Sequence, residues 1–283
     1  DIPLLASSPH LNYWGSKSGI REIFAECEIP FPDGSFLVDT VDQLVLETAK
    51  LWERQPSLKR MVVKLNEGFS GEGNAVLDLR PITTEIDPIT TTLEEKQNLI
   101  EKHLEKLSFQ AADETWETFS SRIPELGAIV EAFIEGEEKR SPSVQGYISP
   151  TGEVEILSTH DQILGGPDGQ IYLGCKFPAD NAYRLKLQEI GLKVGTALAK
   201  KGAMERYSVD FVAVQDPITL AWDLEAIEIN LRKGGTTHPF MTLKLLTNGR
   251  YDYETGLFLS QQNEEKYYIA SDNLYKPQYK GLL

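Results

Sequence analysis

Apolar residues recur at helical spacing in four segments of the chain. Residues 16–28, 41–54, 93–107 and 181–201 each place apolar side chains three or four positions apart, so they fall on one side of a helix. Ser16 precedes the first of these segments and has the side-chain oxygen that an N-cap requires. We therefore predict four helices with one buried face each.

Shorter apolar runs bounded by turn residues predict strands. Glycines lie between the first two of these runs, residues 61–65 and 75–79, as they do at the bend of a strand–loop–strand unit. An extended loop is expected over residues 80–92, and a hairpin over residues 143–158 turns at Pro150. The remaining predicted strands are residues 61–65, 75–79, 127–134, 207–214 and 223–230. The fold class that follows is α+β, rich in antiparallel hairpins with helices laid on the sheets.

Composition places the chain among globular proteins. Its 283 residues are 41% hydrophobic and 25% charged. None of the apolar runs approaches the roughly 20 residues that span a bilayer, and the opening residues lack a signal-peptide core and an initiator Met. We expect no membrane contact, and we expect the sequence to be a fragment or a processed form.

The net charge bears on which ligands the chain can bind, and the cysteine content bears on its compartment. The formal net charge is −15, which argues against a dedicated nucleic-acid binder because phosphate neutralisation needs clustered Lys and Arg. A few buried lysines can still bind one nucleotide. Cys27 and Cys175 cannot form a disulfide framework, so a reducing, cytoplasmic compartment is expected.

The first group with chemical potential is Lys64 with the glycine-rich stretch GFSGEG, residues 68–73. Glycines let the backbone approach a phosphate closely, and free N–H groups there can surround anionic oxygens. The stretch is not a Walker A loop, because no GK[ST] follows and a strand comes next. A glycine-rich hairpin turn with an incidental lysine is the alternative.

The second group is acidic. Asp210 interrupts the apolar strand YSVDFVAV, and Glu228 and Asn230 alternate along EAIEIN. Alternation places Glu228 and Asn230 on one face, and Asp210 joins them if the two strands pair. Two carboxylates and an amide oxygen suit Mg²⁺. The alternative is the solvated face of an edge hairpin.

Two further segments complete the pattern. Residues 232–238, RKGGTTH, combine a guanidinium, two glycines, two hydroxyls and an imidazole, which can hold a carboxylate and stabilise developing charge. Residues 127–138, GAIVEAFIEGEE, resemble a strand that ends in a hinge, where exposed backbone can bind adenine and Glu138 can reach a ribose. A polar surface loop and a plain strand end are the respective alternatives.

The order of these elements resembles the ATP-grasp superfamily. Lys17, Lys64 with its glycine loop, VEAFIEG, Asp210 and EIN at 228–230 follow one another from about residue 11 to about residue 245. Four segments resemble the pheganomycin-type peptide ligases, which are carboxylate–amine ligases. These segments are GSKSGIREIF, STHDQILGG, YLGCKFPA and EINLRKGGTTHPF.

The resemblance implies a role for each matching residue. Lys17 and Lys64 are the two phosphate lysines, the glycine loop closes over the γ-phosphate, and Glu131 begins the adenine hinge. The residues implied to bind the nucleotide are Lys17, Lys64, Gly68, Ser70, Gly71, Gly73, Glu131, Ala132, Phe133, Glu138 and Gln162. Those implied to bind Mg²⁺ are Asp210, Glu228 and Asn230, and those implied to act in catalysis are Arg232 and Lys64. His160 is implied to line the site.

The resemblance also implies two α+β lobes with ATP between them. Residues 1–34 are expected to form an N-terminal helix packed on the large lobe, residues 35–133 the small lobe with a helical insertion at 80–122, and residues 134–283 the large lobe. Superfamily members carry a pre-grasp domain before the first lysine. We therefore expect the site to depend on an N-terminal domain or a C-terminal extension outside this sequence.

The expected activity is ATP-dependent formation of an amide from small-molecule or peptide carboxylate and amine substrates through an acyl-phosphate. Two alternatives remain. One is a nucleotide-binding regulatory or scaffold module without turnover, and the other is phosphotransfer to an acceptor that is not a carboxylate.

Overall fold

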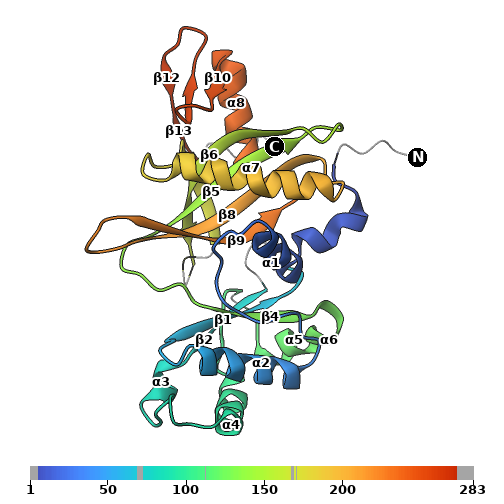
Figure 1. Cartoon of the computed structure of the whole chain (residues 1–283), viewed down its shortest axis with the longest axis vertical. Coiled ribbons are helices and arrows are strands. Elements are labelled where there is room, and N and C mark those ends of the chain that lie inside the picture. The colour runs from blue at the N-terminus through green and yellow to red at the C-terminus, as the bar shows by residue number, and fades with distance from the viewer. Residues whose placement is uncertain (1–5, 69–72, 112, 167–168, 170, 273–283) are drawn as a thin grey trace. The chain divides into compact units, whose positions relative to one another are not determined.

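The computed structural model describes residues 6–68, 73–111, 113–166, 169 and 171–272, which fall into two compact units. The four-stranded unit comprises residues 13–136 and 166–171; the six-stranded unit comprises residues 1–12, 137–165 and 172–283. The elements in chain order (Figure 1) are η1 (Pro9–Gly15), α1 (Lys17–Glu26), α2 (Val41–Arg54), β1 (Arg60–Leu65), β2 (Asn74–Asp78), α3 (Arg80–Thr83), α4 (Leu93–Leu104), β3 (Ser108–Phe109), α5 (Trp116–Ser121), α6 (Ile123–Leu126), β4 (Ala128–Ala132), β5 (Lys139–Ile148), β6 (Val154–Gly165), β7 (Ile171–Phe177), α7 (Arg184–Lys200), β8 (Glu205–Gln215), β9 (Trp222–Asn230), α8 (Thr237–Thr247), β10 (Arg250–Asp252), β11 (Leu257–Leu259), β12 (Glu265–Lys266) and β13 (Tyr268–Ser271).

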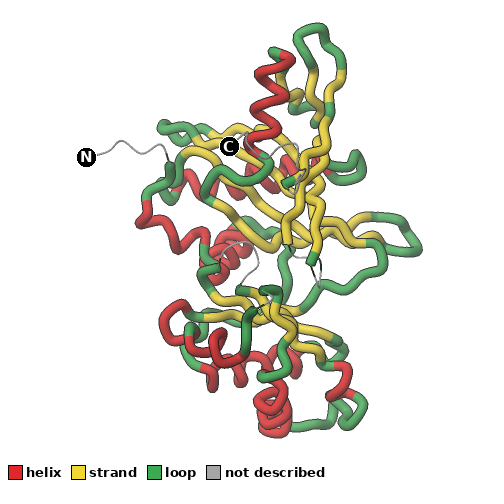
Figure 2. The backbone as a smooth tube through the Cα atoms, turned by 180° about the vertical axis from the view of Figure 1, so that it is seen from behind, coloured by secondary structure: helices red, strands yellow, loops and turns green. Residues whose placement is uncertain are grey.

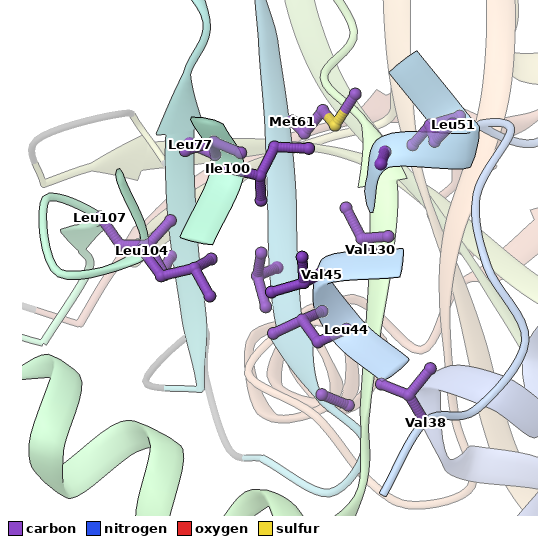
Figure 3. Packing of buried hydrophobic residues seen from close by; sticks show 14 of the residues in the cluster. Val38, Leu44, Val45, Leu51, Met61, Leu77, Ile100, Leu104, Leu107 and Val130 are labelled. Atoms are coloured by element: carbon purple, nitrogen blue, oxygen red, sulfur yellow. The ribbon is translucent and has the colours of Figure 1, made fainter. Parts of the chain in front are cut away.

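The core of the four-stranded unit lies on one face of its sheet, whose strand order is β3-β2-β1-β4. Alternation along β1 turns Met61, Val63 and Leu65 toward this face, where each is at most 1% exposed. Helices α2 and α4 cover them, and Figure 3 shows Leu44 of α2 and Ile100 of α4 directed at the strands. The opposite face carries Val62 and Ile129 together with the charged residues Lys64 and Glu131.

The helices of this unit begin where side chains satisfy their free N–H groups. The Oγ of Ser16 accepts a hydrogen bond from the Gly19 N–H at the start of α1, and Thr40 does the same for α2. At the start of α4, Thr92 and Glu95 form a reciprocal capping box. These contacts fix the first turn of each helix.

The six-stranded unit is built on a sheet of order β13-β7-β6-β5-β8-β9, whose long hairpin strands appear in yellow in Figure 2. Helix α7 crosses β5, β6 and β8 on one face (Figure 1). The ring of Tyr207 fills the space between helix and sheet, since a methyl group added at Gly146 or Gly195 would lie within 2.2 Å of its atoms. These two glycines therefore allow α7 to lie close to the strands.

Beside this sheet, α8 and the small sheet β10-β11-β12 surround a second apolar cluster. It contains Phe177, Phe240 and Phe258, each at most 5% exposed. The cluster joins the segment after β9 to the edge of the main sheet through β13, which pairs with β7.

Most predicted elements are confirmed, with boundary shifts. Two local expectations are wrong. Residues 80–83 form the short helix α3, because Pro81 lies in its first turn, where proline is tolerated. Thr237 and His238 begin α8 instead of ending a polar loop. Helices α5, α6 and α8, and the strands β3, β7 and β10–β13, were not predicted, because most of these elements are too short for a periodic pattern.

The N-terminal helix was expected to pack on the large lobe, and the structure assigns it to the other unit. Helix α1 belongs to the four-stranded unit, because Arg21 bonds to Glu131 of β4 and the Lys17 N–H bonds to the carbonyl of Asn66. No helix within the described residues is long and apolar enough to span a bilayer.

Candidate functional site

Lys64 and Glu131 lie on the face of the four-stranded sheet opposite its core. In the antiparallel pairing of β1 with β4, Val62 is directly opposite Glu131, so the two share a face, and alternation places Lys64 on the same face. Lys64 is 8% exposed and Glu131 is 3% exposed. Charged groups this deeply buried require partners.

Their partners are each other and Arg21. The Lys64 ammonium pairs with Oε2 of Glu131, and Nη1 of Arg21 donates to Oε1 of Glu131 at 2.7 Å. Burial alone would raise the pKa of Glu131, but the Lys64 and Arg21 charges hold it below its usual value. The carboxylate is therefore ionised at neutral pH and directed at two cations.

Lys17, the first residue of α1, lies beside the end of β1. Its N–H donates to the Asn66 carbonyl at 3.0 Å, and the Ser18 N–H donates to the Asn66 side-chain oxygen at 2.8 Å. Asn66 thus satisfies two N–H groups that a helix N-terminus leaves free. The structure places the beginning of α1 next to the strand that carries Lys64.

The glycine loop begins directly after this point. Gly68 and Gly73 approach closely, with an added methyl group at Gly68 lying 3.5 Å from the Gly73 Cα, and the Gly73 carbonyl accepts from the Leu65 N–H at 2.8 Å. The predicted phosphate-binding residues Ser70 and Gly71 lie outside the described residues. The role of the loop stays a prediction.

The predicted adenine hinge follows β4. Its N–H groups at Ala132 and Phe133 donate to the carbonyls of Asp33 and Arg60, at 2.8 and 3.2 Å. The Arg60 guanidinium also lies 3.8 Å from the Phe133 ring centroid. These two N–H groups are occupied within the chain, so a contact with adenine through them requires that they exchange partners.

Glu138, the predicted ribose ligand, lies exposed just before β5 in the six-stranded unit. Its carboxylate accepts from Nε of Arg140 at 3.3 Å. Arg140 in turn bonds to Asp180 at 2.7 Å and lies 4.4 Å from the Trp222 ring. These contacts hold Arg140 on the surface of its unit beside Glu138.

The acidic residues meet on the face of the six-stranded sheet. Asp210 of β8 is directly opposite Glu228 of β9 and Ser143 of β5, and Asn230 is opposite Ser208. The predicted pairing of the two strands is confirmed, and with it the common face of Asp210 and Glu228.

Asp210 is held by three donors. Its Oδ1 accepts from the Ser143 hydroxyl at 2.6 Å and from the Gln162 amide at 2.9 Å, and its Oδ2 accepts from the Asn230 amide at 3.1 Å. Gln145 donates to the Ser143 hydroxyl at 2.9 Å. The carboxylate is therefore fixed in direction by a chain of side-chain hydrogen bonds.

The donor set fits a hard cation such as Mg²⁺. Two carboxylates face each other across β8 and β9, and the Asn230 amide offers its oxygen when the group turns about its terminal bond. Within the described part of the chain, no group of three or more His, Cys, Asp or Glu is arranged to hold a metal. Mg²⁺ is commonly held by one or two carboxylates together with substrate phosphates, so two suffice.

His160 is a buried structural residue of the same sheet. It lies opposite Ser143, is fully buried, and its Nε2 is 2.7 Å from the Tyr268 hydroxyl. Burial lowers the pKa of His160 to about 3, so the imidazole is neutral at physiological pH. Gln162, two residues further along β6, reaches Asp210 instead.

Arg232 lies beyond the end of β9. The strand stops at Asn230, so the alternation that would carry Arg232 to the face of Asp210 and Glu228 does not extend to it. Arg232 is exposed, and its Nη1 donates to the Lys233 carbonyl at 3.3 Å. The following turn packs on Tyr172, since a methyl group added at Gly235 would lie 2.7 Å from that ring.

Sequence reasoning missed four residues of these clusters: Arg21, Asn66, Ser143 and Gln145. Ser143 and Gln145 alternate with a buried valine, which is the pattern of a strand with one polar face. Arg21 follows Lys17 by four positions and so shares its side of α1. Asn66 had no distinguishing signal.

Comparison with known proteins identifies the family. The sequence pattern described as IQCH-like, ATP-grasp matches residues 9–254. This chain is a member of the ATP-grasp superfamily. Solved ATP-grasp structures share its fold: biotin carboxylase from Campylobacter jejuni, as a βγ-ATP complex, has a TM-score of 0.58 at 16% identity over 86% of this chain and 46% of that one.

A second structural neighbour agrees. The biotin carboxylase domain of Hydrogenobacter thermophilus 2-oxoglutarate carboxylase, in complex with MgADP, ADP and bicarbonate, has a TM-score of 0.60 at 16% identity over 94% of this chain and 51% of that one. The expected α+β ATP-grasp fold is confirmed.

Two curated proteins are similar in sequence. L-propargylglycine–L-glutamate ligase from Streptantibioticus cattleyicolor is 30% identical over 272 residues, which are 95% of this chain and 51% of the ligase. IQ motif-containing protein H from Danio rerio is 25% identical over 276 residues, which are 90% of this chain and 26% of that protein. The chain spans about half and about a quarter of their lengths.

Proposed function

We propose that this chain binds Mg-ATP and uses it to join a carboxylate to an amine, as an ATP-dependent carboxylate–amine ligase. The observation that carries this proposal is the pair Asp210 and Glu228, opposite each other on paired strands of an ATP-grasp fold with Asp210 fixed by three donors. The name of the Streptantibioticus cattleyicolor relative, a ligase of two amino acids, supports this type of reaction.

The reaction takes place in two steps. An oxygen of the donor carboxylate attacks the γ-phosphorus of ATP, the bond to the β-phosphate oxygen breaks, and ADP leaves. The amine nitrogen then attacks the carbonyl carbon of the acyl-phosphate, phosphate leaves with the bonding electrons, and the amine loses a proton. Amide, ADP and phosphate are the products.

The residues of this chain position the reactants and balance their charge. Asp210, Glu228 and Asn230 would hold Mg²⁺, which neutralises phosphate charge. Lys64 and Lys17 supply positive charge for the phosphates, and the Glu131 carboxylate keeps Lys64 in place. Ser143 fixes the direction of the Asp210 carboxylate and so would hold it in place for the metal.

A module that binds nucleotide without turnover is the second candidate. The Danio rerio relative is named for a sequence motif and not for a reaction, which is the observation that favours this alternative. The two candidates make the same binding prediction and differ in product formation.

Turnover separates the candidates. The chain is incubated with Mg-ATP and pairs of amino acids, beginning with L-glutamate as one member, and ADP and phosphate are measured. The proposal expects release that requires both members of a pair, and it expects ¹⁸O from a labelled donor carboxylate to appear in phosphate. Nucleotide binding with no pair-dependent release across the screen would favour the second candidate. Asp210→Asn serves as the inactive control.

A further inference from the structure

The buried group Arg21–Glu131–Lys64 contains one residue that no step above requires. We propose that Arg21 is a positioning residue of the nucleotide site: it holds the Glu131 carboxylate and thereby fixes the Lys64 ammonium. This inference rests on the proposed function, because Lys64 is taken there as a ligand of the ATP phosphates.

The geometry around Arg21 is specific. Its Nη1 donates to Oε1 of Glu131 at 2.7 Å and to the Pro32 carbonyl at 3.0 Å, and its guanidinium lies 4.9 Å from the Phe31 ring centroid. The other oxygen of Glu131 pairs with Lys64. One carboxylate therefore bridges two cations that come from different elements, α1 and β1.

The chain leaves room for this bridge at Gly34. The segment containing Gly34 pairs with Glu131, and a methyl group added at Gly34 would lie 2.4 Å from the Val130 carbonyl, 3.0 Å from Cγ of Glu131 and 3.2 Å from Nη1 of Arg21. A side chain at this position would displace either the strand or the ion pair. The segment after α1 therefore needs glycine at position 34 to lie this close to the Arg21–Glu131 ion pair.

Charge balance explains why Glu131 has two partners. Two cations and one carboxylate leave the group with one net positive charge, and all three side chains are at most 14% exposed. The surplus charge favours an arriving phosphate. Without Arg21, Lys64 and Glu131 form a neutral pair, and the ammonium loses both its fixed position and its net attraction for an anion.

Nucleotide affinity measured in a double-mutant cycle tests the inference. Mg-ATP binding to the full chain is measured by calorimetry for the unaltered protein, Arg21→Gln, Lys64→Met and the double variant. Arg80→Gln is the matched control, since Arg80 forms an exposed ion pair with Asp78 in the same unit. Thermal unfolding establishes that each variant is folded.

The expected result is strong coupling. Arg21→Gln weakens binding about tenfold when Lys64 is present and less than about twofold when Lys64 is Met, because Arg21 acts through Lys64. Arg80→Gln leaves binding unchanged. If Arg21→Gln does not fold, Arg21→Lys replaces it in the cycle, since it keeps the charge beside Glu131 and loses only the planar fork.

The role of Arg21 and the proposed function are refuted by different results. Equal weakening by Arg21→Gln in both backgrounds, or none in either, would overturn the positioning role while leaving the proposed function in place. Absence of Mg-ATP binding to the unaltered chain would refute the proposed function itself.

Discussion

Replacing Glu131 with glutamine should destabilise the four-stranded unit substantially. Glu131→Gln preserves the shape of the side chain but leaves Arg21 and Lys64 as two buried like charges without an anion. Removing one partner of a buried ion pair costs about 3–5 kcal/mol. The glutamine oxygen can still accept one of the two hydrogen bonds, so we expect the lower end, about 3 kcal/mol.

Calorimetric unfolding measures this loss. A decrease of about 3 kcal/mol corresponds to about 12 °C for a unit of about 130 residues, because each kcal/mol shifts the melting temperature by about 4 °C at that size. Glu135→Gln is the matched control, since Glu135 pairs with Arg60 on the surface and such pairs contribute at most about 1 kcal/mol. A loss for Glu131→Gln no larger than for Glu135→Gln would refute the reasoning.

The stability that the unaltered chain gains over Glu131→Gln should decrease at low pH. The folded pKa of Glu131 lies below its usual value of 4.5, so the unfolded chain binds the proton more readily and stability rises with pH. The stability difference between the unaltered chain and Glu131→Gln should be constant between about pH 5 and 7. It should shrink as the pH falls below about 4.5.

Three further variants probe the six-stranded unit. Glu228→Gln should abolish ATP turnover and weaken nucleotide binding to a smaller extent. Turnover at the rate of the unaltered chain would show that Glu228 is structural and does not bind the metal. Ser143→Ala should raise the Mg²⁺ concentration for half-maximal phosphate release about tenfold, because Asp210 loses the 2.6 Å hydrogen bond from Ser143, and turnover should recover at high Mg²⁺. Arg232 lies in the turn beyond β9, two residues after Asn230. If its guanidinium contacts the transferred phosphoryl group, Arg232→Lys lowers turnover about 10²-fold with little change in ATP affinity; unchanged turnover would show that its place beyond the strand keeps it out of the reaction.

Sequence patterns predicted the parts of the fold that depend on local spacing. The helix over residues 41–54 was predicted with its observed boundaries, because the spacing of its apolar side is a local signal. The common face of Asp210 and Glu228 followed from strand alternation once the two strands were assumed to pair. The role of Arg232 depended on where β9 ends, and strand ends are weakly encoded.

The partners of the charged residues were not predictable in this way. Glu131 was expected to begin an adenine hinge, but its side chain bonds to Arg21, which is 110 positions earlier. Such a contact depends on how α1 packs on β4, and no spacing rule within either segment reports it. Ser143 was missed because its significance arises only when β5 pairs with β8.

The division of the chain has a consequence for how the protein is made on the ribosome. Residues 13–136 supply nearly all of the four-stranded unit, so that unit can fold as soon as its last strand has emerged. The segment that contains Ser7 cannot settle as early, because the Ser7 hydroxyl donates to the Met204 carbonyl across 197 positions. At about 5–20 residues per second, the segment that contains Ser7 waits roughly 10–40 seconds for Met204. Ser7 can therefore reach its folded position only after Met204 has emerged from the ribosome.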